Sequence, residues 1–107
     1  MIGRALLVGV ADYLLVEPDL PAAVRHDVAD VACALSDPAI GRLHPGMITA
    51  LLDDGAGVAD IRAALEHAAR AATADETFLF YFSGHGTRDG EGGREQSWLL
   101  PHDADFD

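Results

Sequence analysis

The chain of 107 residues contains no lysine and few basic residues of any kind. Seven arginines stand against eighteen acidic residues, so the formal net charge is −11 at pH 7. A surface with that charge repels the phosphate backbones of nucleic acids and the headgroups of acidic membranes. We therefore expect neither nucleic acid nor membrane among the direct partners of this segment.

Cysteine is nearly absent too, since Cys33 is the only one. A single cysteine excludes an internal disulfide and a cysteine-rich zinc site, and it makes a cytoplasmic location the default expectation. Long apolar runs are also missing, because no stretch approaches the roughly 20 residues of a membrane-spanning helix. The apolar N-terminus lacks the length and the cleavage site of a signal peptide, and it is more typical of a strand.

Half of the residues are hydrophobic, which is enough to build a core. Apolar runs predict four strands, over residues 4–10, 47–52, 77–82 and 97–100. Apolar residues at helical spacing predict two helices, one carrying Val24, Val28, Val31 and Leu35 and one over residues 59–72. Residues 83–93 are expected to form a glycine-rich loop, and residues 101–107 a polar tail. This order predicts an α/β fold, with a parallel sheet and helices on its faces.

Functional sites in such sheets form at the carboxyl ends of the strands, where Ser83-Gly84-His85-Gly86 follows the most aromatic predicted strand. The glycines on either side of His85 let a substrate backbone approach closely. A neutral imidazole can take a proton from a thiol, and the N–H that follows it can face an oxyanion. From these residues alone, an ordinary histidine in a glycine turn is an equal alternative.

Four segments in order resemble the caspase and metacaspase clan of cysteine peptidases, and in particular its bacterial members. Residues 80–86 correspond to the family's histidine motif, and residues 97–105 correspond to the segment that follows it. Residues 5–13 correspond to the first strand, and residues 20–28 correspond to the loop into the first helix. The resemblance covers nearly the whole chain. It implies a caspase-like three-layer sandwich, with residues 1–107 as the N-terminal part of a single peptidase domain.

The resemblance also implies a cysteine endopeptidase, in which His85 is the general base and the N–H of Gly86 helps to bind the oxyanion. Ser83 and Asp27 match positions that line the pocket for the residue before the scissile bond. An aspartate in that pocket favours arginine or lysine. Arg25 leaves open the opposite substrate preference, for an acidic residue before the scissile bond. Asp27 could also be an ordinary aspartate in the first turn of a helix, where it interacts favourably with the helix dipole.

The nucleophile is expected in a further part of the peptidase domain, because the family's cysteine follows its histidine by roughly 50 residues. Cys33 lies inside a predicted helix and is expected to be inert. The expected partners are therefore a protein or peptide substrate and the remainder of the domain that carries the cysteine. By family analogy, the activity belongs to regulated proteolysis such as defence or cell death.

Two other functions remain as alternatives. The first is a catalytically inactive caspase-like module for interaction or regulation. The second is a response-regulator-like domain. It would use the carboxylates of Asp12 and of either Asp53 or Asp54, together with the hydroxyl of Ser83, but it needs a lysine that the chain lacks.

No cofactor or metal is expected. Calcium is a weak alternative, because Asp103, Asp105 and Asp107 alternate as carboxylate ligands can, although a polar tail is the favoured interpretation. The remaining histidines share no metal-binding spacing; they are His26, His44, His67 and His102. Trp98 is expected to be a packing residue.

Overall fold

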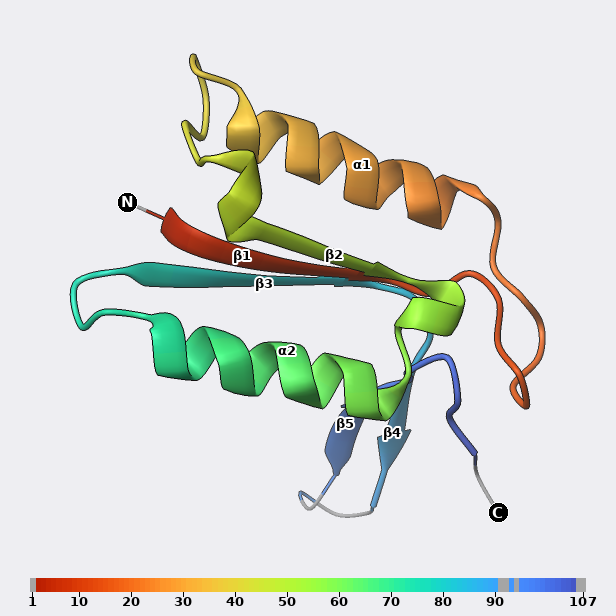
Figure 1. Cartoon of the computed structure of the whole chain (residues 1–107). Coiled ribbons are helices and arrows are strands. Elements are labelled where there is room, and N and C mark those ends of the chain that lie inside the picture. The colour runs from red at the N-terminus through yellow and green to blue at the C-terminus, as the bar shows by residue number, and fades with distance from the viewer. Residues whose placement is uncertain (1, 91–92, 94, 106–107) are drawn as a thin grey trace.

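The structure is a computed structural model, and it describes residues 2–90, 93 and 95–105. Three parallel strands form its central sheet in the order β2-β1-β3 (Figure 1). Their bounds are Ile2–Gly9 for β1, Ile48–Leu52 for β2 and Thr77–Ser83 for β3. The predicted parallel sheet is confirmed, and each predicted strand begins within two residues of the observed one.

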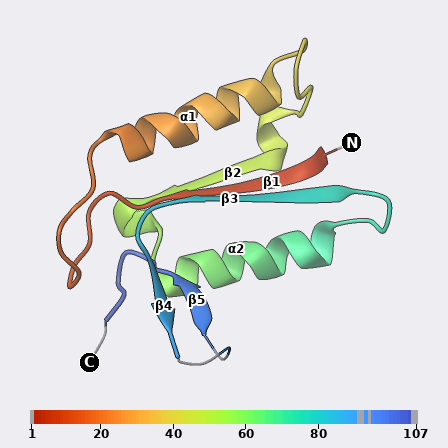
Figure 2. The same cartoon turned by 180° about the vertical axis from the view of Figure 1, so that it is seen from behind.

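Two helices cover the sheet, α1 (Ala23–Ser36) on one face and α2 (Val58–Ala71) on the other (Figures 1 and 2). Successive β1 side chains point to opposite faces, so the strand contributes to two cores. Leu6 and Val8 belong to the cluster that includes Ile61 of α2. Leu7 belongs to the cluster that includes Val28 of α1. The result is the three-layer α/β arrangement that the resemblance implied.

A close approach brings the start of α1 onto the carboxyl end of β1. A Cβ atom placed on Gly9 would lie 2.7 Å from Cγ2 of Val28 and 3.5 Å from the Val24 carbonyl oxygen. Glycine is therefore needed at position 9 to let the first turns of α1 sit above the end of β1. The short turns Pro45–Met47 and Asp53–Gly55 flank β2 on its two sides.

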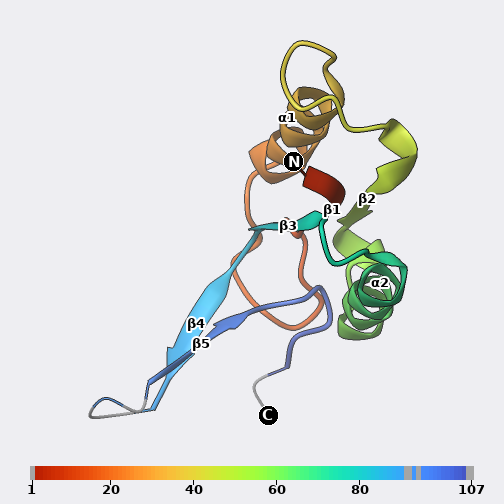
Figure 3. The same cartoon turned by 90° about the vertical axis from the view of Figure 1, so that its left-hand side faces the viewer.

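The remaining strands form a separate antiparallel hairpin, β4 (Gly86–Asp89) with β5 (Gln96–Leu99), which projects away from the sheet (Figure 3). Two predictions were wrong here. The expected loop over residues 83–93 contains β4, and the expected strand 97–100 joins this hairpin rather than the parallel sheet. Trp98 was expected to pack, but it is 50% exposed because the hairpin leaves its face open.

The segment after β5 is fixed to the body of the protein by specific contacts. Leu100 is buried in the core cluster on the α2 side, and Ala104 packs against the same cluster. The predicted polar tail therefore begins as a packed segment, and Asp107 lies outside the described residues. Among the described residues, no helix has the length and apolar composition needed to cross a membrane.

Candidate active site

The carboxyl ends of β1, β2 and β3 meet at one edge of the sheet, as the parallel arrangement requires (Figure 1). Gly9 lies opposite Ser83 in the pairing of β1 with β3. The Val10 N–H then donates to the Ser83 carbonyl at 2.9 Å, so the pairing continues to the last residue of β3. Residues 84–85, which join β3 to β4 and are called the histidine loop below, therefore leave the sheet beside the loop that follows β1.

His85 is held by the loop that follows β1. Its Nε2 atom lies 2.6 Å from the carbonyl oxygen of Pro18. A carbonyl can only accept a hydrogen bond, so this contact places the imidazole proton on Nε2. In the neutral ring, Nδ1 is then left with a free lone pair that can accept a proton.

The backbone of His85 is held as well, by a residue that the sequence analysis did not single out. The His85 N–H donates to the hydroxyl of Tyr13 at 2.7 Å, and that hydroxyl donates to the Leu100 carbonyl at 3.0 Å. The rings of Tyr13 and His85 lie 5.0 Å apart between centroids and are tilted by 45°. Tyr13 is 8% exposed, and burial raises the pKa of its hydroxyl, which stays protonated and able to donate.

The N–H of Gly86 is directed away from β5. The Leu100 N–H donates to the His85 carbonyl at 3.0 Å, so His85 and Leu100 are a hydrogen-bonded pair of the antiparallel ladder. The next pair, Gly86 with Leu99, is then a non-hydrogen-bonded one, whose N–H groups point outward. Within the described residues, β5 is the only strand that pairs with β4. This outward amide belongs to the residue that directly follows His85.

Arg25 is engaged by two carboxylates. Its Nε lies 2.5 Å from Oδ2 of Asp53, and its Nη2 lies 2.9 Å from Oδ2 of Asp12. The hydrogen bond and the charge of Asp53 raise the pKa of Arg25 above its ordinary value. Two of the three guanidinium nitrogens of Arg25, Nε and Nη2, are therefore engaged by carboxylates of the protein itself.

Asp53 connects the ends of two strands to α1. Its Oδ1 accepts from the N–H groups of Ala11 at 2.8 Å and Asp12 at 3.0 Å. Burial acts to raise the pKa of Asp53, but these amides and the Arg25 guanidinium outweigh burial, so its pKa lies below the ordinary value. Asp53 adopts a φ of 47°, in the left-handed region that aspartate tolerates better than most residues. The same contacts occupy the carboxylate that the response-regulator alternative would need.

Asp27 and Ser83 lie at the same end of the sheet, but no hydrogen bond between them is found among the described residues. Asp27 is exposed, one position before the Val28 side chain that covers Gly9, the partner of Ser83 in the sheet. Ser83 is partly buried at the end of β3. The structure therefore places both predicted pocket residues near the histidine loop and leaves the Asp27 carboxylate open to solvent.

The other candidate residues lie apart from this edge or have structural roles. Cys33 is exposed in the last turn of α1, at the opposite end of the sheet from the strand ends that carry His85 (Figure 1). His102 contacts the Asp12 carbonyl through Nδ1 at 2.7 Å, and Asp103 accepts from the Val58 N–H at 2.9 Å. Among the described residues, no group of three or more histidine, cysteine or acidic side chains is arranged to hold a metal ion.

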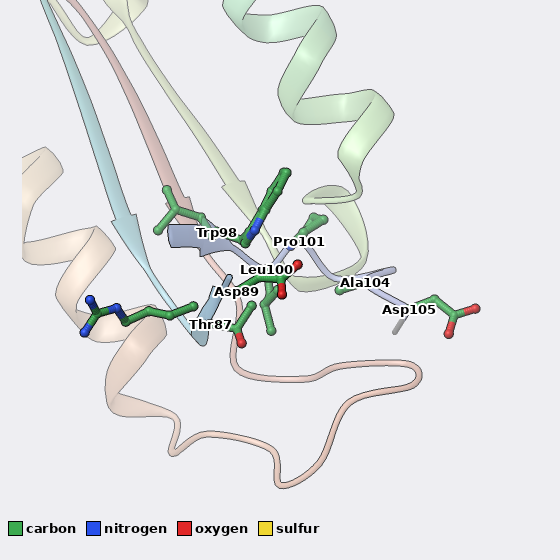
Figure 4. A pocket seen from close by; sticks show the side chains of 9 residues that line it. Thr87, Asp89, Trp98, Leu100, Pro101, Ala104 and Asp105 are labelled. Atoms are coloured by element: carbon green, nitrogen blue, oxygen red, sulfur yellow. The ribbon is translucent and has the colours of Figure 1, made fainter. Parts of the chain in front are cut away.

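Two hollows lie beside the histidine loop. One, of about 640 Å³, is lined by residues 13–19, the loop that contains Tyr13 and Pro18. The other, of about 530 Å³, lies between the β4–β5 hairpin and the following segment (Figure 4). Its lining includes Thr87, Asp89, Trp98, Leu100 and Ala104. Neither hollow is lined by His85 itself.

Sequence reasoning missed Tyr13 and Pro18 as parts of this site. Pro18 acts through its backbone carbonyl, and no side-chain pattern reveals such a role. Tyr13 gave a weak signal, as an aromatic residue in the loop after a buried strand. Its hydroxyl contacts a residue 72 positions away, which the sequence does not indicate.

Comparison with known proteins adds one finding. The family described as Caspase domain matches residues 2–107 of the chain. No individual curated protein matches the chain. The match spans all three layers of the fold as well as the histidine loop and the hairpin. The chain belongs to the caspase-domain family.

Proposed function

We propose that this chain contributes the general base of a cysteine-type endopeptidase, with His85 as that base. The observation that carries the proposal is the 2.6 Å contact between Nε2 of His85 and the Pro18 carbonyl. It fixes the ring with its Nδ1 lone pair free, which is the form that can accept a proton from a thiol. The family match supports a peptidase in general, and the geometry of this contact supports the specific role.

In the proposed reaction, a cysteine thiol gives its proton to Nδ1 of His85, and the thiolate attacks the carbonyl carbon of the substrate peptide bond. The outward N–H of Gly86 donates to the resulting oxyanion. The imidazolium then gives its proton to the leaving amine as the C–N bond breaks. Water, deprotonated by His85, hydrolyses the thioester and regenerates the thiol. These groups complete the reaction without a metal or a cofactor.

The thiol in this proposal comes from a segment of the peptidase domain outside residues 1–107. Cys33 is unsuitable because it lies on an exposed helix surface at the far end of the sheet. We propose that the whole domain acts in the cytoplasm, in regulated proteolysis such as defence or cell death, on protein or peptide substrates.

For specificity, we propose a preference for arginine or lysine immediately before the scissile bond, with Asp27 and Ser83 lining the pocket. Two observations support this preference over an acidic one. The carboxylate of Asp27 is exposed at the correct end of the sheet. The competing cation, Arg25, is already paired with Asp53 and Asp12.

Replacing His85 tests the general-base role directly. His85→Ala in the full-length protein is expected to lower kcat for peptide cleavage by at least about 100-fold, since general-base catalysis contributes 10²–10⁴-fold. The measurement is hydrolysis of a fluorogenic arginyl peptide, with circular dichroism to verify the fold.

His67→Ala is the matched control, because His67 is exposed on α2 and takes no part in the site. Cleavage retained in His85→Ala would remove this histidine from the mechanism. If the wild-type protein is folded, cleaves no peptide and has no reactive thiol, it is an inactive interaction module instead.

Replacing Asp27 tests the pocket. Asp27→Ala is expected to lower kcat/KM for arginyl and lysyl peptides by about 10–100-fold, because a charged hydrogen bond contributes roughly 1.5–3 kcal/mol. Peptides with an uncharged residue at that position should be affected much less. Asp30→Ala, three residues further along the exposed surface of α1, is the control. Cleavage after aspartate that is abolished by Arg25→Ala would overturn the assignment.

A further inference from the structure

The hairpin next to His85 is incomplete at one point. In an antiparallel ladder, each hydrogen-bonded pair exchanges two N–H···O bonds. His85 and Leu100 are such a pair, because they continue the register in which Gly86 lies opposite Leu99. The first bond is present, from the Leu100 N–H to the His85 carbonyl at 3.0 Å. The second, from the His85 N–H to the Leu100 carbonyl, is replaced.

The hydroxyl of Tyr13 stands where the second bond would be. It accepts from the His85 N–H at 2.7 Å and donates to the Leu100 carbonyl at 3.0 Å. Two polar groups that would otherwise join directly are thereby kept apart by one oxygen atom. Because both remain hydrogen-bonded, the opening of the ladder leaves no buried polar group without a partner.

The surroundings of Tyr13 hold the hydroxyl at this point. The Tyr13 N–H donates to Oδ1 of Asp19 at 3.0 Å, and the ring is buried in the core cluster on the α2 side. A Cβ atom on Gly84 would lie 2.8 Å from the hydroxyl oxygen, so a methyl group at position 84 would push the hydroxyl from its place. Asp19 directly follows Pro18, whose carbonyl receives the His85 ring. One short loop therefore holds both the backbone and the imidazole of His85.

We propose that Tyr13 is a positioning residue for His85. The Tyr13 hydroxyl takes the place of the direct hydrogen bond between the His85 N–H and the Leu100 carbonyl, and in this way it orients the histidine. This inference rests on the proposed function only for its effect on catalysis. Without the hydroxyl, the His85 N–H and the Leu100 carbonyl close onto each other. The His85 peptide then turns toward β5, and the ring moves away from the Pro18 carbonyl.

Tyr13→Phe in the full-length protein tests this proposal, because it removes one oxygen atom and keeps the ring. The expected result is a fall in kcat of about 10–100-fold with KM changed much less, since a displacement of about 1 Å at a catalytic group can cost 10²-fold. The matched control is Tyr81→Phe. Tyr81 is a partly buried tyrosine that packs on the α1 side of the sheet, away from the histidine loop.

A second readout is independent of catalysis. In ¹⁵N NMR at a pH where the imidazole of wild-type His85 is neutral, its shifts should show the proton on Nε2. Tyr13→Phe should lose that preference and gain a coupling across a new hydrogen bond between the His85 N–H and the Leu100 carbonyl. Wild-type imidazole shifts in Tyr13→Phe would overturn the proposal, and so would a fall in kcat equal to that of Tyr81→Phe.

Gly84→Ala keeps the test decisive if Tyr13→Phe does not fold. The added methyl group would lie 2.8 Å from the hydroxyl oxygen of Tyr13 and 3.0 Å from Cζ of Phe82, so it displaces the hydroxyl without changing Tyr13 itself. The same loss of the Nε2-protonated form is expected, and unchanged shifts would contradict the proposal. If the wild-type protein cleaves no peptide, the proposed function fails, while the NMR comparison still decides the role of Tyr13.

Discussion

Arg25 and Asp27 lie two positions apart in α1, and each has a charge that suits a different substrate. Their surroundings distinguish them. The guanidinium of Arg25 is held between Asp53 and Asp12, so its charge is neutralised within the protein. Asp27, by contrast, is exposed. The spacing in the sequence did not indicate that Asp53, which is 28 residues from Arg25, is its partner.

Asp103, in the segment after β5, caps the N-terminus of α2. The N-cap position of this helix is Gly57, which has no side chain to accept from the first-turn N–H groups. Asp103 supplies the missing acceptor, since its Oδ1 receives the Val58 N–H at 2.9 Å. A carboxylate at this point also interacts favourably with the positive end of the helix dipole.

We therefore expect Asp103→Ala to lower the stability of the protein by about 1 kcal/mol, within the range measured for lost helix caps. For a domain of roughly this size, that is a fall in Tm of about 4–8 °C. Thermal unfolding followed by circular dichroism measures it. Asp54→Ala is the control, because Asp54 is exposed near the same helix end and forms no hydrogen bond among the described residues. Equal Tm values for the two variants would exclude the capping role.

At the scale of elements, the β4–β5 hairpin contains a strand that local sequence patterns do not predict, namely β4. The segment Gly86–Asp89 has neither the apolar alternation nor the β-branched content of a typical strand. It is extended because β5 pairs with it and because the pairing continues to His85. By contrast, β1 and β3 were predictable because most of their side chains are apolar and pack in the two cores of the sheet.

For the whole molecule, the sequence predicts the layers and the position of His85, but not the contacts that orient it. Apolar periodicity is a local property, so it indicates which strands and helices exist and which face of each is buried. The contacts of His85 come from a backbone carbonyl at Pro18 and a hydroxyl at Tyr13, 67 and 72 positions away. Such long-range polar contacts become visible only when the loops are placed in space.

The stability of the whole fold should depend on Asp53 at acidic pH, because its carboxylate joins β1, β2 and α1. The pKa of Asp53 lies below its ordinary value of 3.8 in the folded protein. Its ionised form therefore stabilises the fold fully above about pH 4, and this contribution is lost as the pH falls through the lowered pKa. We expect it to amount to about 1–2 kcal/mol, since Arg25 is partly exposed to solvent and the charged pair is screened.

Urea unfolding between pH 7 and pH 2 measures this contribution as the difference between the wild-type protein and Asp53→Asn. The difference should be constant at neutral pH and should shrink below about pH 4, when the wild-type carboxylate is protonated as well. Using a difference removes the change in self-repulsion of a protein with a net charge of −11, which both proteins share almost equally. Asp12→Asn is the control, because the Asp12 side chain is 57% exposed and its ion pair should contribute less than about 1 kcal/mol. A difference between wild type and Asp53→Asn that persists unchanged at pH 2 would mean that Asp53 acts through its shape and not through its charge.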